Sequence, residues 1–262
     1  MLPIDHPRFF PAMKLIDEGQ FAEAARQLSE LAAGLSGESR AGALYWKSIC
    51  LGRLGQREDA IASIDDAMTE AEPDSAVGIC LQLQKAYYPE TDEVPGANIA
   101  AVRSVLSRYA KQFSTPDFFW QYMDAKAAIG KGLLRVGEYS EGIAELEESL
   151  SSESRAAARY SKHLWLQDAY YKTGRLEEAK EHLQNALKDA ESAPQTQLPA
   201  DHPALIRYEL ALVAYKQHRL DDAQRELTLA SAVAQNPKTL RCISKLWKLL
   251  HEPKPVDPPS KS

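Results

Sequence analysis

The chain has 262 residues, of which 44% are hydrophobic and 26% are charged, and its formal net charge is −6. This composition excludes a disordered chain, and the acidic balance argues against non-specific nucleic-acid binding, which needs an excess of Lys and Arg. No stretch reaches the roughly 18 to 20 apolar residues that cross a bilayer, and the start of the chain lacks a secretory signal. We therefore expect a cytoplasmic protein without nucleic-acid or membrane partners.

The cysteines Cys50, Cys80 and Cys242 are scattered, and none belongs to a CxxC pair. An odd set without metal-ligand spacing predicts reduced, mostly buried thiols rather than a disulfide framework or a zinc site. We therefore expect neither a metal nor a cofactor.

The N-terminal part is predicted to form two helical hairpins, with helices at 7–17, 21–33, 40–53 and 57–71. Asp5 or His6 would cap the first helix, and Pro11 either lies in its first turn or marks a later start. Pro73 would end the second hairpin.

The third unit is irregular. Apolar residues at helical spacing over 76–88 are followed by an acidic, proline-containing loop at 89–96, and a helix is predicted to resume over 98–113. Such a loop is either a tolerated surface insertion or a contact element at one edge of the molecule. Both interpretations stay open.

Thr115, Pro116 and Asp117 predict a helix start, with a threonine cap, a proline at the first helical position and an acid at the positive end of the dipole. This helix should run to about Val136, a length of roughly 30 Å. Its entry, 118–123, is crowded with aromatic residues, which we expect to pack against the irregular third unit rather than form an exposed docking patch.

Two more hairpins are predicted, with helices at 154–172, 176–192, 202–217 and 220–234. A last helix, 238–251, should cap the molecule, because the final hairpin has no further neighbour to cover its apolar seam. The residues expected to cover that seam are Leu240, Ile243, Leu246, Trp247 and Leu250. The proline-rich tail, 252–262, is expected to be disordered.

Five turns repeat one pattern, in which a residue able to adopt a left-handed conformation is followed by acidic residues and then by a small residue. The left-handed position is occupied by Gly19, Gly55, Gly137, Gly174 and His218. These turns lie 36, 82, 37 and 44 residues apart. The spacings fit a helix-turn-helix period in the mid-thirties, with one degenerate unit skipped and one longer linker.

The residues around these turns suit closely crossing helices, because a small side chain permits a close approach and a large apolar one fills the next turn. Seven residues before each turn stand Ala12, Ser48, Gly130, Gln167 and Ala211. Five residues after it stand Ala24, Ala60, Gly142, Ala179 and Ala223. Four residues later stand Leu28, Ile64, Leu146, Leu183 and Leu227.

In these turns and crossings the chain resembles the tetratricopeptide repeat (TPR) family from Pro7 to Asn236. The resemblance implies an all-α fold, a right-handed α-solenoid of about six helical hairpins plus a C-terminal capping helix, as a single domain over 1–251. The chain departs from the family pattern at His218, at Gln167 and at Arg57, where an aromatic residue is expected.

The resemblance also implies that the first helices line a concave groove, which binds a peptide or helix segment of another protein. The groove positions that carry over are Tyr45, Ile49, Arg53, Lys131, Arg135, Leu164, Asp168, Tyr171, Lys172, Tyr208, Leu212, Tyr215 and Lys216. This mixture suits a peptide with apolar anchors and acidic groups. The Lys and Asn residues that clamp chaperone tails in some members of the family are absent.

No catalytic constellation accompanies the repeats. H-E-x-x-H, G-x-S-x-G and P-loop motifs are absent, and His163 and His182 are separated by a turn and nineteen positions. His6 and His202 precede prolines at helix entries and are interpreted as capping or surface residues. Paired acids such as Glu177 and Glu178 fall on second helices, where they indicate a solvated convex face. We therefore expect the chain not to be an enzyme.

The leading hypothesis is a non-enzymatic adaptor or scaffold that binds a peptide segment of a partner. One alternative is a homo-oligomeric assembly protein, with the aromatic entry 118–122 as a possible homodimer surface. Another is a peptide-sensing regulator without its own DNA-binding domain, because the repeats begin almost at Met1.

Overall fold

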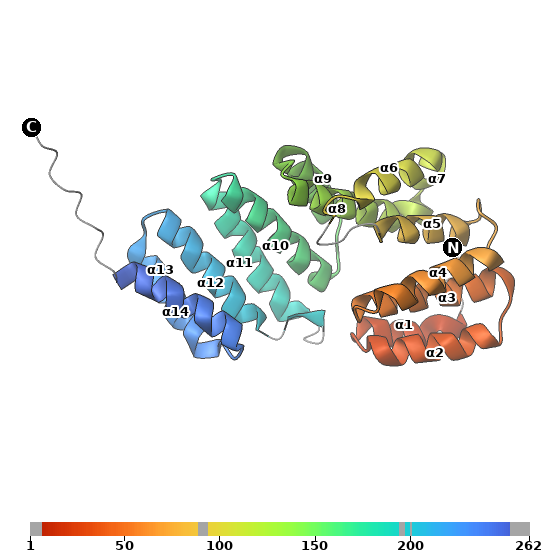
Figure 1. Ribbon diagram of the computed structural model, residues 1–262, viewed down its shortest axis with the longest axis horizontal. Coiled ribbons are helices and arrows are strands. Elements are labelled where there is room, and N and C mark those ends of the chain that lie inside the picture. Colours follow the sequence, from red (N-terminus) through yellow and green to blue (C-terminus); the bar gives the residue numbers. More distant parts are fainter. Residues whose placement is uncertain (1–6, 89–93, 194–196, 200, 252–262) are drawn as a thin grey trace, which may run out of the picture.

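The computed structural model describes residues 7–88, 94–193, 197–199 and 201–251. These residues form helices and contain no strands, which confirms the all-α prediction. Successive helices pair into six hairpins followed by a last helix (Figure 1). The pairs are α1 (Phe10–Asp17) with α2 (Phe21–Ala33), α3 (Gly37–Arg53) with α4 (Arg57–Glu70), α5 (Ala76–Tyr87) with α6 (Asn98–Arg108), α8 (Phe119–Val136) with α9 (Tyr139–Ser151), α10 (Ala156–Lys172) with α11 (Leu176–Ser192), and α12 (His202–Lys216) with α13 (Leu220–Val233); the last helix is α14 (Pro237–His251).

The five predicted turns share one backbone conformation. The four glycines have φ angles between 74° and 88°, and His218 has a φ of 59°. In every turn the N–H of the next residue donates to the carbonyl five positions before it, at 2.8 to 2.9 Å. This is the Schellman hydrogen bond that ends a helix on a left-handed residue. His218 therefore takes the conformation of the glycine it replaces, and the predicted register is confirmed.

The predicted crossing residues that follow each turn are all buried. At the crossing of α8 and α9 two glycines meet, Gly130 and Gly142. A methyl group added to Gly130 would lie 2.9 Å from the carbonyl oxygen of Gly142, and one added to Gly142 would lie 3.0 Å from that of Gly130. Any larger side chain would push these backbones apart, so the close approach explains both glycines.

The second helix of the third unit is shorter than predicted. Tyr109, with φ −112° and ψ 31°, interrupts the expected helix, which divides into α6 and the short α7 (Ala110–Phe113). The buried Tyr109 hydroxyl donates to Asp74 at 3.0 Å and accepts from the Gln82 amide at 2.9 Å. These contacts hold the break against the start of α5. Residues 89–93 of the predicted acidic loop lie outside the described residues.

The predicted cap of α8 is wrong. The Thr115 hydroxyl donates to the carbonyl of Gln112 at 2.6 Å and caps no helix N–H. Residues Pro116–Phe118 form a 3-10 turn, and α8 begins only at Phe119. The Thr115 side chain is thus directed to the preceding helix, and no side-chain hydrogen bond caps the turn that follows it.

The aromatic entry of α8 divides between the interior and the surface. Phe118 and Met123 are buried, and the Phe118 ring packs edge-on against Phe113 with centroids 5.5 Å apart. Phe119 and Trp120 remain 37% and 44% exposed. The predicted packing against the third unit therefore holds for part of the cluster only.

The two ends of the array differ from the prediction in detail. A 3-10 turn (Pro7–Phe9) precedes α1, which starts at Phe10 with Pro11 in its first turn, while Asp5 and His6 lie outside the described residues. At the other end Ile243 and Leu246 bury the seam of the last hairpin as predicted. Leu240, however, is 41% exposed, because it faces away from the hairpin. Residues 252–262 lie outside the described residues.

The linker that follows α11 reaches back to the first helix. The Gln197 amide donates to the carbonyl oxygen of Asp17 at 2.7 Å and to that of Ile16 at 3.4 Å. The array therefore curves enough to bring residues some 180 positions apart into contact.

The described helices bury Cys50 and Cys80, as predicted, whereas Cys242 is only partly buried. Burial raises the pKa of the Cys50 thiol to about 11 and that of Cys80 to about 12, so both remain protonated at neutral pH. No helix in the described part of the chain is long and apolar enough to cross a membrane.

Candidate functional site

The residues predicted to line a groove lie on α3, α8, α10 and α12. Those on α3 do not join the others. Tyr45 is buried, Ile49 packs against the N-terminal core, and Arg53 is exposed at the end of its helix. The members on α8, α10 and α12 form contacts from one helix to the next. We call the surface that they form with Trp165 and Glu209, two residues that were not predicted, the first-helix face. Without the predicted Arg135, it comprises Lys131, Leu164, Trp165, Asp168, Tyr171, Lys172, Tyr208, Glu209, Leu212, Tyr215 and Lys216.

Between α8 and α10, the face is joined by a cation and an aromatic ring. The Lys131 ammonium lies 5.6 Å from the centroid of the Trp165 ring, within the range of a cation–π contact. Trp165 was not among the predicted site residues. Its position next to the predicted Leu164, on the same helix, was the signal available in the sequence.

Between α10 and α12, the predicted lysines already have partners. The Lys216 ammonium lies 3.9 Å from the centroid of the Tyr171 ring and donates to the Tyr171 carbonyl at 3.3 Å. The Lys172 ammonium lies 2.7 Å from a carboxylate oxygen of Asp168. The predicted preference for acidic peptide groups relied on these lysines being available, and at this step they are already engaged within the chain.

Glu209 on α12 is a half-buried acid that sequence reasoning missed. Burial and the negative charge of Asp168 raise the pKa of Glu209 to about 7. Burial, with a contribution from Glu209, also raises the pKa of Tyr171 and of Tyr208. Glu209 therefore lies among one acid and two tyrosines. Within the described chain no ion pair or hydrogen bond to its side chain is found.

The predicted residue Arg135 lies near the end of α8 and is partly buried. Closer to the start of α8, Asp124 bonds to Arg155 at 3.1 Å. Burial raises the pKa of Asp124, an effect that Arg155 only partly offsets. The charge of Asp124 adds to burial in raising the pKa of Tyr45 and of Tyr87. Tyr45 thus belongs to a second, N-terminal group of polar residues.

His163 and His182, which the sequence separates by a turn, meet in the hairpin of α10 and α11. Their Nδ1 atoms lie 2.8 Å apart, and Nε2 of His163 lies 3.6 Å from Asp189. Burial lowers the pKa of both rings, and the neighbouring His182 helps to bring that of His163 to about 4. At neutral pH both rings are therefore uncharged, and one Nδ1–H donates to the other.

His202 is buried, so its interpretation as a surface residue is wrong. Its Nδ1 atom bonds the carbonyl of Pro199 at 3.1 Å, and its ring lies edge-on to Tyr160 with centroids 6.1 Å apart. These contacts make His202 part of the packing between α10 and α12. In the residues that the structure describes, no cluster of three or more His, Cys, Asp or Glu side chains is arranged to hold a metal ion.

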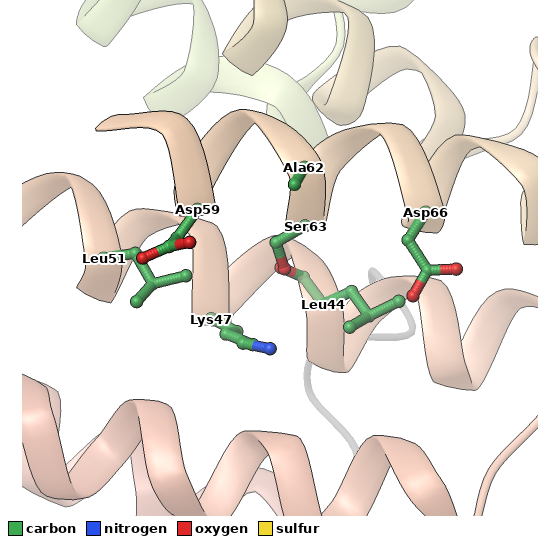
Figure 2. A pocket seen from close by; sticks show the side chains of 7 residues that line it. All are labelled: Leu44, Lys47, Leu51, Asp59, Ala62, Ser63 and Asp66. Atoms are coloured by element: carbon green, nitrogen blue, oxygen red, sulfur yellow. The ribbon is translucent and has the colours of Figure 1, made fainter. Parts of the chain in front are cut away.

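A separate cleft of about 450 Å³ lies between α3 and α4. Figure 2 shows its lining residues, which are Leu44, Lys47, Leu51, Asp59, Ala62, Ser63 and Asp66. Asp66 at one end pairs with Arg40 at 2.7 Å. None of the residues of the first-helix face lines this cleft. The two surfaces are therefore distinct.

No family model matches the chain, and no curated protein sequence matches it. Among solved structures, NprR in complex with its cognate peptide NprX is similar over 92% of this chain and 70% of its own, with 16% identity and a TM-score of 0.56. A TPR protein from Parabacteroides merdae matches 94% of this chain and 98% of its own, with 14% identity and a TM-score of 0.40. The C-terminal part of a TPR-containing protein from Cytophaga hutchinsonii matches 89% and 98%, with 13% identity and a TM-score of 0.38.

Proposed function

We propose that this chain, which has the fold of the tetratricopeptide repeats, is a non-enzymatic interaction scaffold that binds an extended segment of a partner protein on its first-helix face. The observation that carries the proposal is a contact at each of two successive steps between the first helices of this face. Lys131 meets Trp165 between α8 and α10, and Tyr171 meets Lys216 between α10 and α12.

The chemical character of the face supports this function. Its tyrosine, tryptophan and leucine side chains are partly buried, so they combine solvent access with a large apolar area. Rigid aromatic side chains of this kind dominate the binding energy of protein interfaces. The likeness of the fold to NprR, which was solved with a bound peptide, supports the same mode of binding by analogy.

The exposed pair Phe119 and Trp120 favours self-association as a second candidate function. Their rings lie edge to face with centroids 5.3 Å apart, and both lie at the entry of α8. Large exposed aromatic side chains that adjoin each other mark contact surfaces more often than isolated ones do. Light scattering at high micromolar concentration distinguishes the two functions, because a monomer excludes self-association.

The scaffold function is tested by selecting peptides from a random dodecapeptide phage library and measuring the affinity of the enriched peptides by fluorescence polarisation. We expect Tyr171→Ala with Lys172→Ala to weaken binding about tenfold or more, because truncating an aromatic anchor removes much of an interface's energy. The matched control is Lys188→Ala with Glu191→Ala, two exposed residues of α11. Both double variants should keep a Tm within a few degrees of the wild type.

Absence of enriched peptides with the wild-type protein contradicts the proposal. So does equal affinity of the first-helix variant and the α11 control for the selected peptides.

A further inference from the structure

Two acids, Asp168 on α10 and Glu209 on α12, lie on the first-helix face, where these helices contact each other through Tyr171 and Lys216. The charge of Asp168 acts on Glu209, and both side chains project from first helices of neighbouring units. Asp168 has a counter-ion, because Lys172 lies 2.7 Å from it. The other lysine at this step, Lys216, is held on the ring and the carbonyl of Tyr171. Glu209 is therefore a half-buried carboxyl without a cation among the described residues.

The contact between α8 and α10, one repeat earlier, shows that the fold does not require two acids between neighbouring first helices. Lys131 and Asp168 each stand one residue after the crossing position of their helix, which is Gly130 or Gln167. Trp165 and Glu209 each stand two residues before the crossing position of the next helix. The step from α8 to α10 thus pairs a cation with an aromatic ring, which is attractive. The step from α10 to α12 pairs two acids, which is repulsive in a partly desolvated place. A bound cation would turn the second step into a favourable one.

We propose that this step binds a lysine or arginine side chain of the partner segment, with Glu209 as its counter-ion and the rings of Tyr171 and Tyr208 beside its aliphatic stem. The inference rests on the scaffold function proposed above and specifies the partner's chemistry. It replaces the acidic preference predicted from the sequence for this part of the face. Lysine and arginine stems pack on apolar and aromatic surfaces while their charged ends reach a carboxylate.

The residues around Glu209 favour a basic side chain of a partner over a free metal ion. The first-helix face continues towards α8 through Trp165 and along α12 through Leu212, so a chain passing this step has contacts on either side. A divalent ion would need further oxygen ligands, and one of the two acids already pairs with Lys172. Burial and the negative charge of Asp168 disfavour the ionised form of Glu209 and raise its pKa to about 7. No cation among the described residues counteracts this effect.

The test repeats the phage selection with the wild type, Glu209→Gln and Glu209→Lys, with Glu191→Gln on α11 as the matched control. We expect the wild type and the control to enrich lysine or arginine at one fixed peptide position. Glu209→Gln should lose that preference while keeping the apolar ones, and Glu209→Lys should enrich aspartate or glutamate at the same position.

An enriched peptide is then synthesised with its basic residue intact or changed to alanine, and with a free or an acetylated N-terminus. Glu209→Gln should bind the intact peptide about tenfold more weakly than the wild type does, and the alanine peptide with unchanged affinity. This pattern isolates the pair from any general loss of folding, because a misfolded variant would lose both peptides.

Peptides enriched without a basic position, or a basic preference that survives in Glu209→Gln, overturn the inference and leave the scaffold function standing. A peptide whose binding is lost on acetylation overturns the side-chain assignment in favour of a terminal amine. Absence of enrichment with the wild type overturns both the inference and the scaffold function.

Discussion

The N-terminal and C-terminal hairpins share one repeat but differ in what they bury. In the described part of α1 to α6 the buried polar side chains are Ser48, Ser63 and Asn98. From the end of α9 to the start of α12 they are Ser149, Glu153, Lys162, His163, Gln167, Asp189, Asp201 and His202. Every buried charged side chain of the described residues therefore belongs to the C-terminal hairpins.

The ion pair at the start of α10 shows how the C-terminal interior is held. Glu153 accepts from Lys162 at 3.0 Å and from Arg155 at 2.9 Å, and Lys162 also donates to the carbonyl of Ser149 at 3.2 Å. Burial by itself would raise the pKa of Glu153. The hydrogen bonds from Arg155 and Lys162 outweigh burial and lower this pKa to about 2. Apolar packing is non-directional, whereas this group depends on each partner being present.

The difference teaches that a common repeat does not imply a common source of stability. The N-terminal hairpins rely on small and apolar side chains at their crossings. The C-terminal hairpins add charged and titratable groups, so their stability depends on individual partners and on pH. Three measurements test this difference between the two sets of hairpins.

The largest effect is expected from Lys162→Met, which leaves Glu153 buried with Arg155 as its remaining cation. Removing one partner of a buried pair costs about 3 to 5 kcal/mol, because a desolvated charge loses its compensation. The N-terminal counterpart is Ser63→Ala, which removes one neutral bond to the Leu44 carbonyl and should cost about 0.5 to 1.5 kcal/mol. Urea unfolding monitored by circular dichroism gives both values.

Adding Glu153→Leu to Lys162→Met should restore most of the lost stability, since an apolar pair of similar volume replaces the ions. Equal losses for Lys162→Met and Ser63→Ala would show that the two interiors do not differ as described.

A second measurement examines what the two regions share. Ala60 and Ala179 occupy the same crossing position in different hairpins, and both are fully buried. Leucine at either site should overfill the crossing and cost about 1 to 3 kcal/mol. The control Ala144→Leu, at an exposed position of α9, should leave the free energy of unfolding within about 0.5 kcal/mol of the wild type. Tolerance of leucine at Ala60 but not at Ala179 would mean that the crossings are not equivalent.

The smallest effect concerns pH. Folding lowers the pKa of His163 from its ordinary value of 6.5 to about 4, so between these values the unfolded chain binds more protons. Stability that is present above pH 6.5 is therefore lost as the pH falls towards 4. Between pH 7 and pH 5 the loss should be at most about 2 kcal/mol, from 1.36 kcal/mol per unit of pKa shift.

Replacing His163 by Asn places an amide near the position of Nδ1 but removes the titration, so His163→Asn should abolish most of this pH dependence. His251→Asn, at an exposed position of α14, should leave it unchanged. Denaturant titrations of both variants at pH 7 and pH 5 provide the values. An undiminished pH dependence in His163→Asn would place its source outside the histidine pair.

Three of the residues predicted to line the groove form contacts in the structure, and the groove itself stays a prediction. Lys131, Tyr171 and Lys216 lie where the repeat register placed them, and each touches its neighbour or a residue of the next helix. Trp165 and Glu209 were missed because the groove positions were taken three residues before each crossing residue and one, four and five residues after it, whereas these two residues stand two before it. Tyr45 was expected with the others but is buried in the N-terminal core.

The helical hairpins, their left-handed turns and the small residues at most of their crossings could be predicted from the amino-acid sequence. These depend on the conformational freedom and the size of single side chains a few positions apart, which local spacing reveals. Three features appear only in the folded chain: His163 bonds His182, Gln197 bonds the end of α1, and the charge of Asp168 acts on Glu209. Such contacts depend on the curvature that accumulates over successive hairpins, and many small packing angles set that curvature together.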